Sequence, residues 1–234
     1  AEDGIREKLV TGVQTCALPI FGIAAYSAGA RFINSNRLTR EALPVLREVV
    51  DRCGFTCTLS VLDATRPLYL LGIDGPISAD FASKVGTYFH HHATASGKLL
   101  TAFADDQTRT ALLKRERIQL TPQTVVDLAS LRTELARIQK QGFAVSFAER
   151  IAGIGAIAVP VFGAKEECLA ALGIAYPISL VAEAKFEYFA ELLHGRARTL
   201  SMRMGAQKYP FGGDPQPVHL STQGDMTNTD TSKA

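Results

Sequence analysis

The sequence contains no tryptophan, only three methionines and only four cysteines in 234 residues. It also lacks any run of about 18 consecutive apolar residues, which excludes the usual pattern of a membrane-spanning helix. Neither sign of charge dominates, since 25 Lys and Arg stand against 23 Asp and Glu for a formal net charge of +2. This balance argues against a chain that coats nucleic acid through bulk electrostatics.

The four cysteines are Cys16, Cys53, Cys57 and Cys168. They could form two disulfides, but a chain of this size does not need such crosslinks. Cys53 and Cys57 are close in sequence, yet no second pair of Cys or His follows at zinc-finger spacing. We therefore expect reduced thiols in a cytoplasmic protein, with no membrane contact and no structural zinc.

The chain divides into three segments of different character. Residues 1–20 show no useful period and resemble the translated read-through of a sequencing adapter, so we expect the natural protein to begin near residue 20. Residues 21–210 contain no internal repeat and are apolar enough to form one domain with a buried core. Residues 211–234 are rich in Thr, Ser, Asn and Asp, which predicts a disordered tail.

Apolar periodicity within the domain predicts both helices and strands. The predicted helices cover residues 26–53 with a break at 36–39, a stretch that starts at the N-cap Thr94, and residues 106–115, 121–141 and 180–205. The predicted strands cover residues 56–63, 68–73, 84–91, 154–162 and 169–175. Short turns at residues 66–67 and 163–166 join neighbouring strands. We therefore predict an α+β fold with a mainly antiparallel central sheet and helices packed on it.

Three motifs resemble the signature of the IclR family of bacterial transcription regulators. They are His92-Ala93-Thr94-Ala95-Ser96-Gly97-Lys98 followed by Leu99-Leu100, then Leu131 to Val145, and Glu149 to Phe162. The resemblance covers about residues 26–205 and implies the C-terminal effector-binding domain, which has a GAF-like fold with a long C-terminal helix. The family places a winged helix-turn-helix before this domain. Nothing before Tyr26 resembles that DNA reader, so we expect it to be missing here.

The resemblance also implies a function. The domain would bind a small organic acid and thereby control, through allostery, how a DNA-binding regulator meets its operator. Such regulators work as homodimers or homotetramers, need no cofactor and are not enzymes. A stand-alone GAF-like ligand-binding module with no DNA role is the alternative.

The candidate site begins at Thr94, Ala95 and Ser96. A helix N-terminus leaves backbone N–H groups without helical partners, and its dipole favours anions. The small side chains of Ala95 and Ser96 would let a carboxylate approach these amides. The resemblance places effector contacts at the same two residues. From the residues alone, a purely structural helix cap is the alternative.

The resemblance adds four positions to the pocket: Ser146, Ala156, Gly173 and Ala175. Family members that bind small oxo-acids tend to carry an acid, a thiol and two hydroxyls there. This chain has one hydroxyl, two methyl groups and a glycine, which implies a roomier and less polar pocket. An unpaired buried polar group is costly, so we expect an acid with an apolar body, aromatic or branched.

Three other features have alternative interpretations. His90, His91 and His92 could supply metal ligands, although a strand that leads into the helix cap is the simpler interpretation. A nucleophilic enzyme is disfavoured because the sequence has no G-x-S-x-G motif. The last helix carries Arg196, Arg198, Arg203 and Lys208, which could contact phosphates or could simply complement the helix dipole.

Overall fold

The computed structural model describes residues 29–77, 85–181 and 185–212, together with residues 23 and 27. A five-stranded sheet runs through these residues in the order β2-β1-β5-β4-β3. The strands are β1 (Thr56–Asp63), β2 (Arg66–Ile73), β3 (Ala144–Phe147), β4 (Ile154–Phe162) and β5 (Cys168–Pro177). Every neighbouring pair is antiparallel, which confirms the predicted α+β fold.

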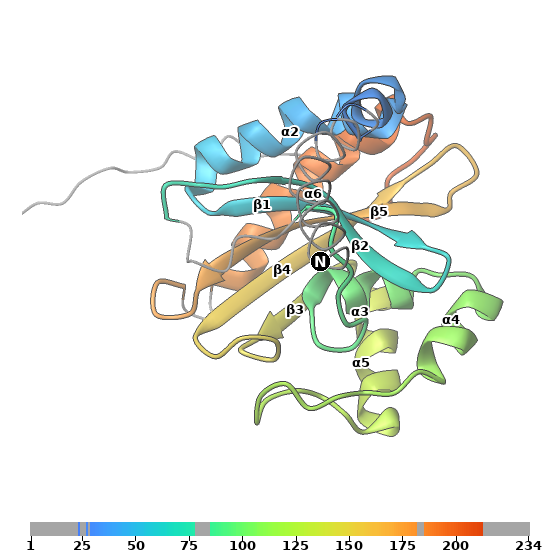
Figure 1. Ribbon diagram of the computed structural model, residues 1–234, viewed down its shortest axis with the longest axis vertical. Helices are drawn as coiled ribbons and strands as arrows, with labels where there is room; N and C mark the ends of the chain where they lie inside the picture. Colours follow the sequence, from blue (N-terminus) through green and yellow to red (C-terminus); the bar gives the residue numbers. More distant parts are fainter. Residues whose placement is uncertain (1–22, 24–26, 28, 78–84, 182–184, 213–234) are drawn as a thin grey trace, which may run out of the picture.

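Helices cover both faces of this sheet, so the domain has three layers (Figure 1). The helices are α2 (Arg37–Cys53), α3 (Ala95–Ala102), α4 (Asp106–Leu113), α5 (Leu128–Gln141) and α6 (Phe186–Arg203). Helices α2 and α6 lie on one face, and α3 and α5 lie on the other, with α4 beyond α3 (Figure 1). The predicted long C-terminal helix is therefore present as α6.

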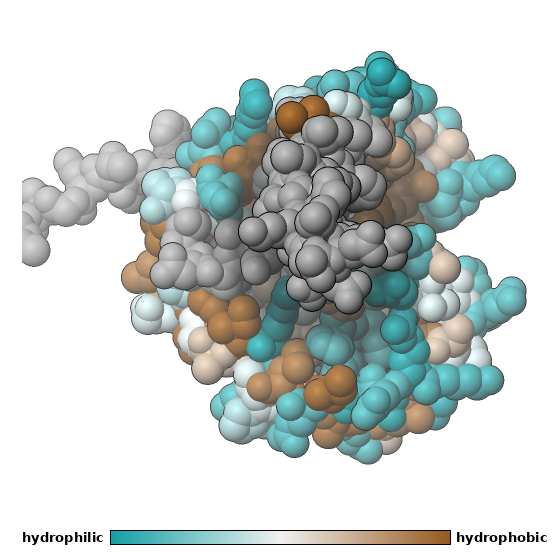
Figure 2. Space-filling view, in the orientation of Figure 1, coloured by the Kyte–Doolittle hydropathy of each residue, from teal (hydrophilic) through white to brown (hydrophobic). Residues whose placement is uncertain are grey.

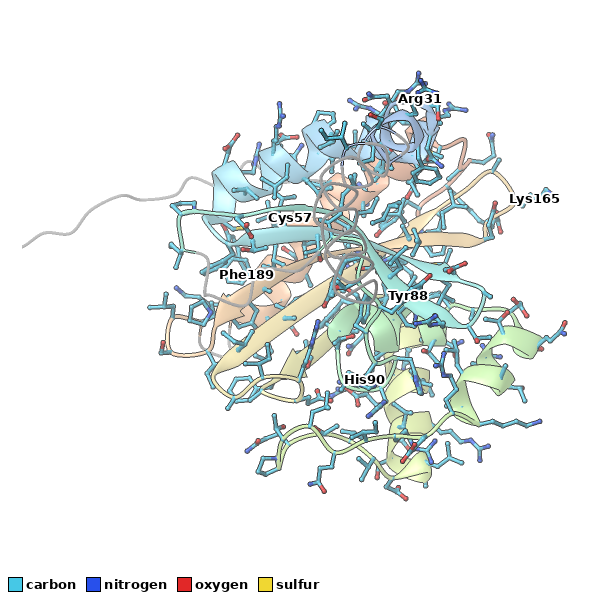
Figure 3. The ribbon with its side chains drawn as sticks, in the orientation of Figure 1. Arg31, Cys57, Tyr88, His90, Lys165 and Phe189 are labelled. Atoms are coloured by element: carbon cyan, nitrogen blue, oxygen red, sulfur yellow. The ribbon has the colours of Figure 1, made fainter. Side chains whose placement is uncertain are left out.

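The alternation of side chains along the strands separates two hydrophobic clusters. On β1, Cys57 and Leu59 belong to the cluster under α2 and α6, and Figure 3 shows Cys57 on that side with Phe189. On the other face, the strands present the small Ala158 and Ala171 to α3 and α5. Since these methyl groups occupy little space, α3 packs close to the sheet, and its eight residues are all buried.

The ends of α2 follow from its flanking residues. The side chain of Asn36 accepts hydrogen bonds from the amides of Leu38 and Thr39, at 2.9 and 3.4 Å, and so caps the helix start. Gly54 ends the helix in the left-handed conformation, with φ of 74°. The predicted break at residues 36–39 is therefore the beginning of α2, and residues 29–35 form a separate helical stretch before it.

The start of α5 was predicted too early. The helix begins at Leu128, after the N-cap Asp127, rather than at residue 121. The reason is that Thr121 and Thr124 direct their hydroxyls to carbonyls of the loop after β3 instead of entering a helix. The predicted end holds, because Gly142 closes α5 with φ of 82°.

Three strand predictions need correction. β2 begins at Arg66 rather than Leu68, and the turn before it lies at residues 64–65. No strand covers the described part of residues 84–91, where Tyr88 makes only an isolated bridge to Leu68. The short strand β3 was not predicted at all, because four residues carry too little alternation to be recognised.

Helix α6 starts at Phe186, later than the predicted residue 180, and residues 178–181 carry no helix. The doubtful segment 1–20 and most of the predicted tail, from residue 213 on, lie outside the described residues. Within the described residues, no helix is long and apolar enough to cross a membrane.

The long loop between α4 and α5 carries exposed apolar side chains. Ile118, Leu120 and Val126 are 46%, 37% and 36% exposed. In the view of Figure 2, brown apolar atoms lie among teal polar ones in the lower half of the molecule, where this loop runs. Exposed apolar groups that gather on one face are typical of contact surfaces.

Candidate functional site

A cavity lies on the face of the sheet that carries α3. It is lined by residues from all five strands, from the start of α3 and from the loop after β3: Thr58, Tyr69, Thr94, Ala95, Ser96, Ser146, Arg150, Ile151, Ile154, Gly155, Ala156, Ile174 and Ala175. About 50 Å³ of it is open to the centres of water molecules. A single water needs roughly 10–15 Å³ on that measure, so the cavity has room for a compact small molecule.

Six of the seven residues proposed from the sequence line this one cavity. They are Thr94, Ala95, Ser96, Ser146, Ala156 and Ala175. The seventh, Gly173, does not line the cavity but lies directly beneath it, because a Cβ atom built on Gly173 would be 3.3 Å from the hydroxyl oxygen of Ser96. The fold therefore brings together segments that are far apart in sequence.

The start of α3 forms a polar corner of the cavity. The hydroxyl oxygen of Thr94 accepts a hydrogen bond from the amide of Gly97 at 3.0 Å. The amides of Ala95 and Ser96, at the first positions of the helix, have no helical partners. Ser96 is only 7% exposed, and within the described residues its hydroxyl makes no hydrogen bond. This corner can therefore accept an anionic or hydrogen-bonding group from a ligand.

Three polar side chains that line the cavity, Thr58, Tyr69 and Arg150, are absent from the sequence prediction. Arg150 comes from the loop after β3, and Tyr69 comes from β2. A guanidinium nitrogen of Arg150 donates a hydrogen bond to the phenolic oxygen of Tyr69 at 2.6 Å. Arg150 belongs to no periodic pattern and its partner is remote in sequence, so only its position after Glu149 could have drawn attention to it. The cavity is consequently more polar than predicted on this side.

A buried ion-pair cluster lies beside the cavity. Lys98 of α3 is 0% exposed, and its ammonium group donates to Glu134 at 2.7 Å and to Glu149 at 2.6 Å. The second carboxylate oxygen of Glu149 has no partner in the described residues. Burial raises the pKa of Glu149, although Lys98 opposes that effect. The cluster ties α3 to α5 and to the residue that precedes Arg150.

Two threonine hydroxyls also hold the backbone of the loop after β3. Thr124 donates its hydroxyl hydrogen to the carbonyl of Glu149 at 2.6 Å, and Thr121 donates to the carbonyl of Ala148 at 2.7 Å. Ala148 itself has a positive φ of 55°, a conformation that is unfavourable for a residue with a Cβ atom. Side-chain and backbone contacts together therefore fix where Arg150 enters the cavity.

The histidine run plays a structural role in the described residues. Nε2 of His92 lies 2.9 Å from the carbonyl oxygen of Ile118, so the ring holds the loop between α4 and α5. No group of three or more potential metal ligands occurs within the described part of the chain. Figure 3 shows His90 on the α3 side of the sheet. The predicted strand through this run is not present in the described residues, and His92 instead contacts the loop between α4 and α5.

Three buried histidines, His91, His92 and His194, have lowered pKa values, and the two large shifts make the stability of the domain depend on pH. Burial lowers the pKa of His91 and of His194 to about 4 in each case. In the unfolded chain each group takes up a proton near pH 6.5, whereas the folded chain does not, so acid favours unfolding. We expect the free energy of unfolding to fall by about 2–3 kcal/mol as the pH drops from 6 to 5.

Urea unfolding at a series of pH values measures this slope. The variant His194→Asn removes one of the two groups and should reduce the slope by about one proton, whatever its own stability at neutral pH. A wild-type stability that does not change between pH 6 and 5 would contradict the assignment of two neutral buried histidines.

The thiols and the cationic helix end do not suggest catalysis. Cys53, Cys57 and Cys168 are free, and burial raises the pKa of Cys168 to about 12, which keeps the thiol protonated and unreactive. Of the predicted cationic patch, Arg196 pairs with Glu48 at 2.8 Å, Arg203 with Glu41 at 3.6 Å and Lys208 with Glu166 at 3.2 Å. These three side chains therefore form ion pairs within the domain.

Comparison with known proteins identifies relatives of this arrangement. A family model described as "Bacterial transcriptional regulator IclR C-terminal" matches residues 30–202. The HTH-type transcriptional regulator XynR of Escherichia coli K12 is 30% identical over 185 residues, which are 79% of this chain and 73% of XynR. The HTH-type transcriptional regulator KdgR of the same organism is 30% identical over 187 residues, 80% of this chain and 71% of KdgR. These relatives are regulators, which confirms the prediction against an enzyme.

Two solved structures extend the comparison. The crystal structure of the Thermotoga maritima IclR protein is 27% identical with a TM-score of 0.74, and the match covers 78% of this chain and 74% of that one. An IclR homologue from Microbacterium hydrocarbonoxydans, solved in complex with 4-hydroxybenzoate, is 26% identical with a TM-score of 0.65, and the match covers 72% of this chain and 68% of that one.

Proposed function

Because the chain belongs to the IclR family of bacterial transcriptional regulators and carries its effector-binding domain, we propose that the cavity beside α3 binds a small organic acid. The observation that carries this proposal is the polar corner formed by Ala95 and Ser96. These two residues carry two free amides and an unpaired hydroxyl, and they line a cavity of small-molecule size. A carboxylate would satisfy all three donors at once.

The walls of the cavity favour an acid with an apolar body. Ile151, Ile154, Ala156, Ile174 and Ala175 supply aliphatic surface. A flat aromatic or a branched acid would cover this surface, whereas a highly hydroxylated acid would leave polar groups unpaired. The complex of the Microbacterium homologue with 4-hydroxybenzoate supports an aromatic acid as the first compound to test.

Effector binding would act on DNA through the arrangement of subunits. A ligand shifts an equilibrium between two arrangements only if it binds one of them more tightly. We place this regulation in a homodimer or homotetramer, because the exposed apolar residues of the loop between α4 and α5 suit contacts between copies. The DNA readers of the regulator would then meet their operator differently with and without the acid.

A thermal-shift experiment on the full chain tests the binding proposal. We expect 4-hydroxybenzoate or benzoate, at about 100 times its dissociation constant, to raise the melting temperature by roughly 5–10 °C. Glyoxylate and pyruvate should produce much smaller shifts, because they cannot cover the aliphatic walls. Strong stabilisation by glyoxylate or pyruvate, with none by the aromatic acids, would reject the proposal.

A pair of matched variants locates the binding site. Ser96→Val removes the unpaired hydroxyl and fills the corner, so it should abolish the shift caused by the acid. Thr133→Val makes a similar hydroxyl-to-methyl change on the exposed face of α5 and should leave the shift unchanged. Sedimentation velocity with and without the acid then shows whether binding changes the arrangement of subunits.

A further inference from the structure

Arg150 is a cation without an anion. Its side chain is partly buried and lines the cavity, yet no acidic residue in the described part of the chain forms an ion pair with it. Its one hydrogen bond within the described residues goes to the hydroxyl of Tyr69. A guanidinium group has five N–H donors, so most of its donor capacity is unused.

Tyr69 makes the same corner richer in donors. Since arginine can only donate, the phenolic oxygen of Tyr69 accepts the bond from Arg150, and its own O–H hydrogen is left for another acceptor. Tyr69 is 8% exposed and stacks on Phe89, with ring centroids 4.1 Å apart. Burial raises the pKa of Tyr69, so the phenol keeps its proton. The two side chains together offer several donors and no acceptor.

The position of this corner is fixed relative to α3. Glu149, the neighbour of Arg150, is bonded to Lys98, and Lys98 lies one turn after Ala95 on the same helix. The Lys98–Glu149 ion pair therefore joins the loop that carries Arg150 to α3, and both donor corners line the same cavity. Aliphatic side chains from β4 and β5 line the cavity with them.

We propose that Arg150 and Tyr69 form a second anion-binding point in the cavity, and that the effector is a compact acid with a second carboxylate or a comparable acceptor on its apolar body. This inference rests on the proposed function, because it assumes that a first carboxylate binds at Ala95 and Ser96. A monoacid satisfies only one of the two donor corners. A diacid satisfies both and neutralises the charge of Arg150.

Calorimetric titration of the full chain with benzoate, phthalate, isophthalate and terephthalate tests this proposal. We expect the dicarboxylate with the best-matched spacing to bind wild type at least 10-fold more tightly than benzoate. In Arg150→Met and in Tyr69→Phe this preference should shrink, and in Arg150→Met it should reverse, since an unpaired second carboxylate must still lose its water. Benzoate affinity should fall less than dicarboxylate affinity in both variants, because benzoate has no second carboxylate for the corner of Arg150 and Tyr69.

Arg132→Met serves as the control, since Arg132 lies exposed on α5 and its loss should leave all affinities unchanged. Equal loss of benzoate and dicarboxylate affinity in Arg150→Met, or no loss of either, would overturn the second anion-binding point while leaving the proposed function intact. A wild-type protein that binds none of the four acids would instead overturn the proposed function, and this inference with it.

Discussion

Replacing Lys98 by methionine should lower the free energy of unfolding by about 3–5 kcal/mol. The variant leaves the carboxylates of Glu134 and Glu149 beside each other without the ammonium group that lies 2.7 and 2.6 Å from them. Because Lys98 is fully buried, water cannot reach the site to solvate the carboxylates that the ammonium group leaves behind. Removing one partner of a buried ion pair is far more harmful than removing an exposed one.

The loss of stability in Lys98→Met should become smaller as the pH falls. Without Lys98, the pKa of Glu149 in the folded protein rises further above its unfolded value, so the variant becomes relatively more stable as the pH falls. Urea unfolding at pH 5 and at pH 7.5 measures this difference. Adding Glu149→Gln to the variant should recover part of the loss, because it removes the buried carboxylate that has lost its ion-pair partner, whereas Glu134 still has Arg137 at 3.8 Å.

The control for this prediction is Lys140→Met, which removes an exposed lysine near the end of α5. Its free energy of unfolding should stay within about 0.5 kcal/mol of wild type. A loss below about 1 kcal/mol in Lys98→Met would show that the cluster contributes little to folding.

Replacing glycine by alanine should change the free energy of unfolding in opposite directions in two helices, α3 and α6. In α3, a Cβ atom on Gly97 would lie 2.7 Å from the carbonyl oxygen of His91 and 2.8 Å from that of His90. These are backbone atoms, which cannot move aside as a flexible side chain can. We expect Gly97→Ala to lower the free energy of unfolding by about 2–3 kcal/mol.

Gly195 in α6 is the matched control, because nothing lies within 4 Å of a Cβ atom built there. Alanine favours a helix over glycine, so Gly195→Ala should raise the free energy of unfolding by about 0.5–1 kcal/mol. Denaturant midpoints of the two variants against wild type decide the comparison. Stabilisation by Gly97→Ala would mean that the segment before α3 can shift, which would contradict the tight contact of Gly97 with the carbonyls of His90 and His91.

The fold could be predicted where local chemistry decides it. Thr94 as an N-cap and Gly142 as a helix end follow from short-range hydrogen bonding and from the conformational freedom of glycine, and both predictions are confirmed. The start of α5 could not be predicted, because Thr121 and Thr124 bond to a loop that is distant in sequence. Tertiary contacts override local propensity there.

In the candidate site, too, some residues follow from local chemistry and others depend on tertiary contacts. Ala95 and Ser96 could be proposed because a helix start exposes its amides whatever surrounds it. The pairing of Arg150 with Tyr69 could not, since it depends on how the loop after β3 lies against β2. Residues that act through geometry between remote segments leave no periodic signal in the sequence.

The strand order also bears on how the chain acquires its shape during synthesis. β1 sits beside β5 in the middle of the sheet, where Thr58 pairs with Gly173, although most of the domain lies between them in sequence. The edge of β1 that faces away from β2 therefore stays unpaired until β5 has been synthesised and pairs with it. Closing such a long loop is slow compared with forming local contacts. We expect the nascent chain to need protection of that edge until β5 has left the ribosome.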